Sequence, residues 1–296
     1  MTADGRAGVT AELVARLVAG QFPAWADLPV RPVEADGWDN RTYRLGEELS
    51  VRLPTRERYV AGVAKEDRWL PVLAPRLPLP VPVPVATGRP AAGYPHPWSV
   101  RRWIPGRPLT SAGVADPTGL GLAVAGFLRA LRAVPATGGP AAGTHSFLRG
   151  CPPAGYAAEV RTALDELGTE VDRRGAEEVW RRALASSRQQ PAVWFHGDVA
   201  AGNLLLDDTG RLAAVIDFGT CGVGDPACDL VLAWTALAGD ARAAFREAVG
   251  LDEPCWRRAA GWALWKALVV LAGRSGTAAE DAAQHTVIRE VSTELG

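Results

Sequence analysis

The segment WFHGDVAAGNLLLDD, Trp194–Asp208, places an acid, Asp198, and an amide, Asn203, five residues apart ahead of an apolar run. The longer stretch NLLLDDTGRLAAVIDFG predicts a hairpin of two apolar strands around an Asp-Asp-Thr-Gly turn. Because a hairpin reverses direction, its outer ends, near Asn203 and Asp217, should lie at the same end. The sequence therefore predicts that two carboxylates and one amide oxygen converge.

Carboxylate and amide oxygens suit Mg²⁺, which takes one or two protein ligands and completes its shell with substrate phosphates. A remaining aspartate can accept a hydroxyl proton while the metal neutralises charge on a transferring phosphoryl group. The alternative is structural: Asp198 and Asp217 cap turns, and Asn203 bonds to the backbone. The three residues at this spacing, with Phe218 and Gly219 behind Asp217, favour a phosphoryl-transfer site.

HGDVAAGN followed by IDFG resembles the catalytic loop and metal-binding motif of the aminoglycoside phosphotransferase family, which is related to the protein kinases. The protein-kinase pattern has Arg between the His and the Asp; Gly197 stands there in this sequence, as in the small-molecule branch. The resemblance implies that Asp198 is the catalytic base and that Asn203 and Asp217 are Mg²⁺ ligands. It implies an orienting role for His196.

The resemblance extends from about residue 36 to 237 and implies an α+β, protein-kinase-like two-lobe fold. In that fold a small antiparallel-sheet lobe precedes a mainly helical lobe, and the residue patterns agree, since the first third is strand-rich and the remainder helical. We expect an N-terminal nucleotide-binding lobe at 1–98, a hinge at 99–107, and a helical lobe at 108–296. The helical lobe should hold the catalytic loop and the substrate pocket.

A kinase-like first lobe needs a strand cation that contacts the phosphates and a glutamate from the following helix. The family usually supplies lysine, but the only lysines here are Lys65, on a predicted helix, and Lys266, in the last third. Arg52, in the predicted strand LSVRLP, stands at the expected position. Glu66 falls on the apolar stripe of the next helix, where a carboxylate needs a cation. We therefore predict an Arg52–Glu66 pair; the alternative is a surface glutamate on a poorly phased helix.

Other nucleotide contacts are predicted from position. The segment DGWDNRTYRLG occupies the place of the phosphate-covering loop, so we assign Gly37 and Asn40 as near the nucleotide. In the hinge SVRRWIPG, backbone groups should meet the base, which puts Arg101 and Trp103 near the cofactor. No Walker-type G-x-x-x-x-G-K-[ST] motif occurs in the sequence. The implied cofactors are ATP or GTP and Mg²⁺.

Composition excludes some partners. The net charge of −1 and the absence of a basic run argue against nucleic acid or an anionic membrane as a partner. Four cysteines without CxxC spacing predict reduced thiols, and the N-terminus does not resemble a signal peptide. The most apolar late segment, GWALWKALVVLAG, carries Lys266 and predicts a core helix. We expect a cytoplasmic protein that is a monomer or a weak dimer.

Two further features favour structural interpretations. Asp225 followed by Pro226 predicts a helix start, and Asp229 then favours the N-terminal end of that helix. In the family that the sequence resembles, this motif, GDPACD here, also steadies the catalytic loop, and we favour this structural role over direct catalysis. A late apolar helix carries three tryptophans, which predict core packing rather than stacking on a substrate: Trp256, Trp262 and Trp265.

The expected activity is ATP- or GTP-dependent phosphorylation of a hydroxyl on a small molecule. An aminoglycoside-type antibiotic is the first candidate substrate, which would make antibiotic resistance the expected role. The alternatives are another small alcohol (a macrolide, a peptide antibiotic or a metabolite) and a nucleotide-binding pseudokinase. The pseudokinase is suggested by Arg52 in place of lysine and by the single glycine in the predicted phosphate-covering loop. The intact Asp198, Asn203 and Asp217 argue against it. Arginines offset much of the acidic charge in the helical segments expected to line the substrate pocket: Glu159, Asp165, Glu166, Glu170, Asp252 and Glu253.

Overall fold

A β-hairpin forms the centre of the N-terminal sheet. The computed structural model describes residues 8–33, 39–111, 113–274 and 276–295. Strands β2 (Asn40–Leu45) and β3 (Leu49–Pro54) pair antiparallel, with Leu45 opposite Leu49. Gly46 begins the turn at φ 59°, a left-handed conformation that costs glycine little.

The strands of this sheet follow the order β1-β2-β3-β5-β4, and all neighbours are antiparallel. The remaining strands are β1 (Val30–Pro32), β4 (Pro84–Gly88) and β5 (Trp98–Arg102). The segment LPLPVPVPV, residues 77–85, alternates proline with leucine or valine and leads into the edge strand β4, whose register shifts between Pro84 and Ala86. An edge is where a strand tolerates proline, because the missing N–H need not join the ladder.

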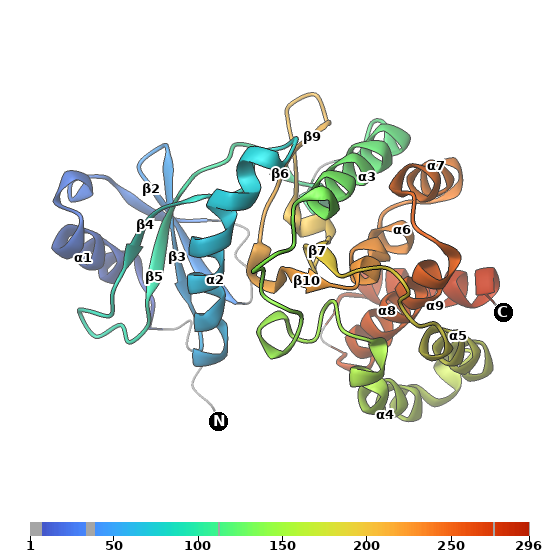
Figure 1. The fold of residues 1–296 in the computed structure, drawn as a ribbon. Helices are drawn as coiled ribbons and strands as arrows, with labels where there is room; N and C mark the ends of the chain where they lie inside the picture. Colours follow the sequence, from blue (N-terminus) through green and yellow to red (C-terminus); the bar gives the residue numbers. More distant parts are fainter. Residues whose placement is uncertain (1–7, 34–38, 112, 275, 296) are drawn as a thin grey trace. The chain divides into compact units, whose positions relative to one another are not determined.

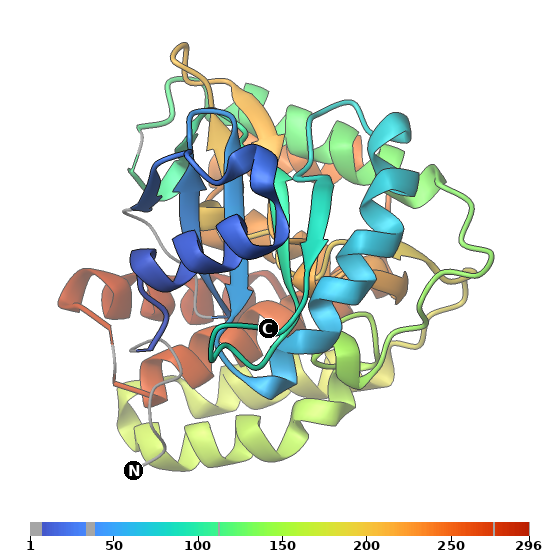
Figure 2. The ribbon, with the colours of Figure 1, turned by 90° about the vertical axis from the view of Figure 1, so that its left-hand side faces the viewer.

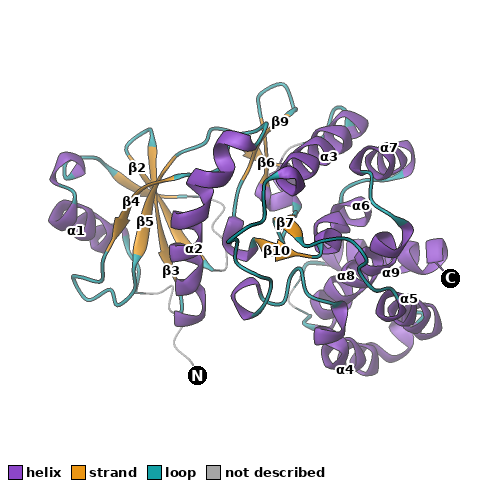
Figure 3. Cartoon of the chain, in the orientation of Figure 1, coloured by secondary structure: helices purple, strands orange, loops and turns teal. Residues whose placement is uncertain are grey.

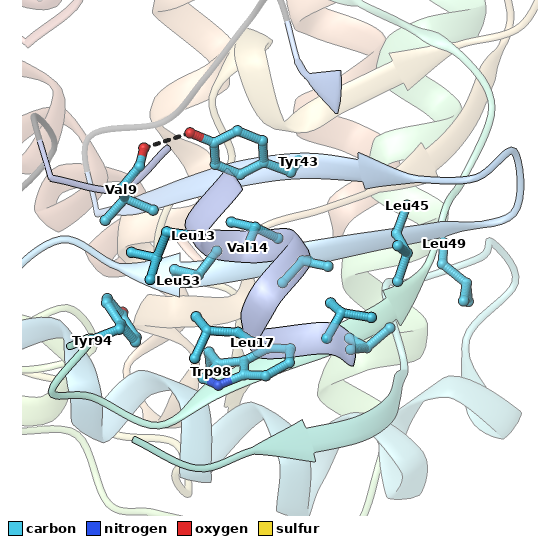
Figure 4. Close-up of a cluster of buried hydrophobic side chains, with 13 residues drawn as sticks. Val9, Leu13, Val14, Leu17, Tyr43, Leu45, Leu49, Leu53, Tyr94 and Trp98 are labelled. Atoms are coloured by element: carbon cyan, nitrogen blue, oxygen red, sulfur yellow. Dashed lines mark hydrogen bonds between the residues drawn. The ribbon is translucent and has the colours of Figure 1, made fainter. Parts of the chain in front are cut away.

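One face of the sheet is apolar and is covered by α1 (Ala11–Gln21) (Figures 1 and 2). Thr10 caps this helix, with its hydroxyl accepting from the N–H of Leu13 at 3.3 Å. Figure 4 shows the side chains between helix and strands, and the hydroxyl of Tyr43 donating to the carbonyl of Val9. The buried cluster is Val9, Leu13, Val14, Leu17, Val18, Tyr43, Leu45, Leu49, Val51, Leu53, Tyr94, Trp98 and Val100.

The opposite face of the sheet is polar and packs against α2 (Glu57–Leu73). Because side chains alternate along a strand, Arg52 on β3 lies on the face opposite Val51 and Leu53. Arg52 is in register with Ser99 of β5, and Arg101 follows Ser99 on the same face. The strands therefore present two arginines to the helix that carries Glu66.

Backbone contacts divide the chain into two compact units. Unit 1 comprises residues 1–106 and 214–219, and unit 2 comprises residues 107–213 and 220–296. The short return of the chain to unit 1 contains the IDFG motif. A hinge function for residues 99–107 stays a prediction.

Unit 2 is mainly helical (Figure 3). Helix α3 packs against α7, and α8 packs against α4, α5 and α9. The helices are α3 (Pro117–Ala133), α4 (Ala157–Leu167), α5 (Arg173–Ala185), α6 (Leu232–Thr235), α7 (Gly239–Val249), α8 (Glu253–Ala272) and α9 (Ala278–Leu295).

Helix α8 is buried on most of its surface, as the apolar sequence around Lys266 predicts. Its buried residues fall on all sides of the helix rather than along one stripe, because α4, α5 and α9 surround it. Among the described residues, no helix is both long enough and apolar enough to span a membrane.

Short strands position the motifs of the catalytic segment. Strand β7 (Val193–Phe195) pairs with β10 (Gly222–Gly224), and β8 (Leu204–Leu206) lies between β6 (Arg107–Pro108) and β9 (Leu212–Val215). The turn between β8 and β9 is closed by Asp207, whose carboxylate accepts from the N–H groups of Thr209 and Arg211 at 2.8 and 3.0 Å. The hairpin predicted from the sequence is confirmed.

Candidate active site

Glu66 is the centre of a buried ion cluster in unit 1. Its side chain is 4% exposed, and it lies on α2 against the polar face of the sheet. Arg101 donates to both carboxylate oxygens, at 3.0 and 2.9 Å, and Arg52 Nη1 donates to Oε1 at 3.4 Å. The predicted contact between Arg52 and Glu66 is therefore present, but Arg101 is the closer partner.

The two arginines keep Glu66 charged. Burial alone would raise the pKa of this carboxyl, and an isolated buried charge costs several kcal/mol. The Arg101 guanidinium, followed by that of Arg52, outweighs burial and lowers the pKa of Glu66 to about 2. Glu66 is thus ionised at neutral pH, and it fixes two cations on the sheet.

Arg52 also reaches the IDFG motif. Its Nη2 donates to Asp217 Oδ1 at 3.0 Å, so that the guanidinium bridges Glu66 and Asp217. The two carboxylates raise the pKa of Arg52 although burial opposes them. Asp217 has a left-handed backbone, with φ 66°, which is uncommon for a residue other than glycine and is frequent at functional sites.

Lys65 holds the same motif from the other side. It lies on α2 next to Glu66, is 8% exposed, and donates from Nζ to the carbonyl of Gly219 at 2.7 Å. The sequence placed Lys65 on a helix but did not indicate this role, because its partner is 154 residues away. Arg52 and Lys65 together fix both ends of the Asp217–Gly219 segment in unit 1.

In unit 2 the HGD loop is shaped by Asp229. This buried carboxylate accepts from the backbone N–H groups of His196, at 2.9 Å, and Gly197, at 2.6 Å. Burial raises the pKa of Asp229, and these donors together with the His196 ring oppose the rise. The predicted role of Asp229 in steadying the loop is confirmed.

Gly197 leaves no room for a side chain. Its φ is 91°, and a Cβ would lie 2.7 Å from Thr220 Oγ1 and 2.8 Å from the Thr220 carbonyl oxygen. The Thr220 hydroxyl donates to the carbonyl of His196 at 2.9 Å, which fixes the two segments at this spacing. The arginine that protein kinases carry at this position therefore does not fit in this chain.

Asp225 links the loop region to α8. It caps the short helix Pro226–Val231 by accepting from the N–H of Ala227 at 3.2 Å, so the predicted helix start is confirmed. Arg258 of α8 donates to both Asp225 oxygens, at 2.5 and 3.1 Å, in a buried pair. The sequence did not indicate Arg258, since the pairing depends on how α8 packs.

Asp198 is held by two donors. Lys266 Nζ lies 2.9 Å from Oδ1, and Asn203 Nδ2 donates to Oδ2 at 3.2 Å and to the Asp198 carbonyl at 2.9 Å. Burial would raise the pKa of this carboxyl, but the Lys266 ammonium, with smaller contributions from His196 and Arg149, holds the pKa below its usual range. Asp198 is therefore an oriented carboxylate.

The amide of Asn203 fits the side-chain chemistry of a Mg²⁺ ligand. Its nitrogen bonds to Asp198, which assigns the amide orientation and leaves the oxygen without a hydrogen bond among the described residues. No cluster of three or more His, Cys, Asp or Glu that could hold a metal occurs in residues 8–33, 39–111, 113–274 and 276–295. Mg²⁺ takes one or two protein oxygens and completes its shell with substrate phosphates.

Asp198 lines a pocket in unit 2. The wall combines the carboxylate with two cations and two indole rings, and Trp262 and Trp265, although buried in the core as predicted, also face this pocket. The lining residues are Arg149, Gly197, Asp198, Val199, Cys228, Val231, Trp262, Trp265 and Lys266.

The remaining predicted nucleotide contacts occupy different environments in unit 1. Arg101 is 1% exposed, and its guanidinium is bound to Glu66 and Ser99. The ring of Trp103 lies under the Arg44 guanidinium at 4.2 Å. Asn40 is the partly buried first residue of β2, and Gly37 lies outside the described residues. Nucleotide contact by these residues stays a prediction.

An antiparallel sheet with one helix supplying a buried glutamate, a mainly helical unit that carries the HGD motif, and a return of the chain to the first unit at the IDFG motif define a protein-kinase-like fold. The chain belongs to the phosphotransferase enzyme family, whose sequence profile matches residues 30–262. The predicted fold class and enzyme class are confirmed: the protein is a small-molecule phosphotransferase. No curated protein matches the chain by sequence.

Solved structures share the fold at low sequence identity. The GDP complex of aminoglycoside 2'-phosphotransferase-IIIa superposes with a TM-score of 0.72 at 17% identity, covering 97% of this chain and 99% of that one. Macrolide 2'-phosphotransferase MphH from Brachybacterium faecium gives 0.61 at 23% identity, with 94% and 98% covered. The streptomycin-ATP-APH(2")-IIa complex gives 0.61 at 16% identity, with 97% and 96% covered.

Proposed function

We propose that the protein transfers the γ-phosphoryl group of ATP or GTP to a hydroxyl of a small molecule, with Asp198 as the base. The observation that carries this proposal is the carboxylate of Asp198, which is ionised, oriented by Lys266 and Asn203, and partly open to a pocket. Its side chain is 36% exposed, so an acceptor hydroxyl can reach it.

The proposed step replaces one oxygen bond at the γ-phosphorus by another. The acceptor oxygen forms a bond to the γ-phosphorus, the bond from that phosphorus to the bridging oxygen breaks, and the hydroxyl proton passes to Asp198. A positioned base of this kind typically contributes about 10²–10⁴-fold to the rate. Lys266 keeps the carboxylate deprotonated and correctly oriented before the hydroxyl arrives.

Arg52 takes the place of the usual lysine in this proposal. It is a strand cation fixed by Glu66, as the phosphate contact of a kinase requires. Its guanidinium presents several donors in one plane and can bond phosphate oxygens in a bidentate manner. The alternative of a pseudokinase is weakened because Asp198, Asn203 and Asp217 are all intact.

Asn203 and Asp217 are the proposed protein ligands of Mg²⁺. They contribute the hard oxygen donors that Mg²⁺ prefers. The amide oxygen of Asn203 and the second carboxylate oxygen of Asp217, Oδ2, make no hydrogen bond among the described residues. When bound, the ion would neutralise charge on the nucleotide phosphates. Asp217 is already oriented by Arg52, and Asn203 by Asp198.

The acceptor is proposed at the level of a small hydroxylated molecule. The solved structures of similar fold are described as aminoglycoside and macrolide phosphotransferases, one of them with streptomycin and ATP bound. An aminoglycoside and a macrolide are therefore the first antibiotics to include in an acceptor panel, with peptide antibiotics and metabolite alcohols beside them.

The test is transfer of labelled phosphate from ATP and from GTP, with water and with each alcohol as acceptor. Asp198→Asn removes the base while keeping the shape of the side chain, so turnover should fall about 10²–10⁴-fold with little change in nucleotide affinity. The proposal is wrong if that variant keeps the turnover of the parent, or if the parent transfers phosphate to nothing, water included.

A further inference from the structure

Arg149 is a pocket cation without a carboxylate partner among the described residues. It lines the same pocket as Asp198, and its hydrogen bonds to the described residues are long ones from Nη1, at 3.5 Å to the Phe147 carbonyl and 3.4 Å to the Tyr156 hydroxyl. Whereas Arg149, like Arg132, does not, eight described arginines of unit 2 form ion pairs with carboxylates: Arg173, Arg181, Arg182, Arg242, Arg246, Arg257, Arg258 and Arg274. The positive charge of Arg149 is thus available to a ligand.

Aromatic rings hold this guanidinium in place. Its central carbon lies 4.5 Å from the ring centroid of Trp265, 5.4 Å from that of Trp262 and 5.9 Å from that of Tyr156. The Tyr156 and Trp265 rings are themselves 4.1 Å apart. A guanidinium that packs on rings keeps its charge and its in-plane donors, so it can still bond an oxyanion at its edge.

The charge of the pocket wall has a surplus of one cation. Asp198 forms its ion pair with Lys266, and Arg149 acts on the same carboxylate without an ion pair, so the three charges among the lining residues sum to +1. Several acidic side chains of the neighbouring helices are engaged elsewhere: Asp165 pairs with Arg173, Glu170 with Arg274 and Glu253 with Arg246, and Asp252 caps α8. Glu159 is not a lining residue, but it accepts from Nε1 of the lining residue Trp265 at 2.9 Å.

We propose that Arg149, with Trp262 and Trp265, forms an acceptor subsite that selects an alcohol bearing an anionic group and disfavours polycations. This inference rests on the proposed function, since it places the hydroxyl of the acceptor at Asp198. An acceptor carboxylate bonds Arg149, and its apolar part lies against the part of Trp265 that is open to the pocket, since Trp265 is 8% and Trp262 2% exposed. A molecule with several ammonium groups, such as an aminoglycoside, meets Arg149 and Lys266 with no free carboxylate on the wall.

A matched set of probes tests the charge preference without knowledge of the natural acceptor. The compounds 3-(4-hydroxyphenyl)propionate, tyrosol and tyramine share a hydroxyphenyl ring and are anionic, neutral and cationic. Dissociation constants measured by ligand-observed NMR on the full chain should rank the acid tightest and the amine weakest. Kanamycin and erythromycin, measured alongside, should bind more weakly than the acid.

Variants at Arg149 assign the preference to this residue. Arg149→Met keeps an apolar stem on Trp265 but removes the charge, so the acid should lose about 10- to 100-fold in affinity while tyrosol changes little. Arg149→Lys should recover part of the loss, and Arg149→Glu should reverse the ranking of acid and amine. Arg181→Met, which removes an exposed arginine from α5, is the matched control and should leave the ranking unchanged. Melting temperatures establish that each variant is folded.

Three results would overturn the inference. The first is equal binding of acid and amine to the parent chain, and the second is an unchanged ranking in Arg149→Met. The third is a loss of ATP affinity in Arg149→Met with no effect on the acid, which would assign Arg149 to the γ-phosphate instead. If the ranking holds but no transfer depends on Asp198, the subsite stands and the proposed function fails, so the two are separable.

Discussion

Lys266 Nζ lies 2.9 Å from Asp198 Oδ1, although 68 residues separate the two in the chain. Lys266 comes from the middle of α8, and Asp198 from the loop that follows β7. The ammonium lowers the pKa of the carboxyl against the effect of burial, so the proposed base is deprotonated well below neutral pH. The site in unit 2 thus includes a cation, Lys266, that no sequence motif predicts.

Lys266→Met should alter the pH dependence of turnover. Asp198 acts as a base only when it is deprotonated, so activity is lost as pH falls through its pKa. Removing Lys266 raises that pKa, and the acidic limb of kcat/KM should therefore move to higher pH, with a lower maximum. Lys266→Arg keeps the charge and serves as the control. A parallel loss at every pH, without movement of the limb, would make Lys266 a purely structural residue.

Much of the fold was predictable because its signals are local. The hairpin around Gly46 and the cap at Thr10 follow from nearby residues, and the burial of Glu66 follows from the helical period. Of the two arginines that bind Glu66, the sequence predicted one. Arg52 was inferred from its strand position, but Arg101 takes the shorter bonds because it follows Ser99 on the same face of a neighbouring strand.

Contacts that depend on helix packing could not be predicted. The apolar pattern of α8 correctly indicated a core helix, but such a pattern does not say which residues face a cavity inside the core. Trp262, Trp265 and Lys266 line the pocket because α8 passes beside the catalytic loop. Arg258, one turn before Trp262 on the same helix, reaches Asp225 for the same reason.

Asp217→Ala should weaken Mg²⁺-dependent nucleotide binding. It removes a proposed ligand and also leaves Arg52 with Glu66 alone. Titration of ATP at several Mg²⁺ concentrations should show a loss of affinity that added Mg²⁺ recovers in part. Asp207→Ala, in the turn of the same hairpin, is the control. Nucleotide binding that is indifferent to Mg²⁺ in both the parent and Asp217→Ala would show that the metal assignment is wrong.

Glu66 should stabilise the fold in a pH-dependent manner. Its pKa falls from 4.5 to about 2 on folding, so its contribution is fully present above about pH 4.5 and is lost as pH falls through about 2. Glu66→Gln should unfold more easily than the parent by a few kcal/mol at pH 7, because it leaves buried arginines without their counter-charge. In urea titrations the difference between the two proteins should shrink from pH 4.5 to pH 2. A difference that does not change over this range would contradict the assigned pKa.

The two arginines that bind Glu66 should differ in what they contribute to stability and to nucleotide binding. Arg101 is 1% exposed and makes the two short bonds, whereas Arg52 makes one bond of 3.4 Å and also reaches Asp217. We expect a double-mutant cycle between Arg101 and Glu66 to show the larger coupling in unfolding free energy, within the usual range of about 0.5–3 kcal/mol. Arg52→Met should instead lower the free energy of ATP binding by more than it lowers the free energy of unfolding.

Arg52→Lys refines this division of roles. A lysine supplies one point charge and cannot donate to Glu66 and Asp217 from two separate nitrogens, so nucleotide affinity and turnover should be kept only in part. Calorimetric titration of ATP and urea unfolding, measured on the same variants, give the two readouts. If Arg101→Met loses nucleotide affinity at unchanged stability while Arg52→Met does the reverse, Arg101 is the phosphate contact and Arg52 the structural partner. The predicted role of Arg101 near the nucleotide would then hold in place of that of Arg52.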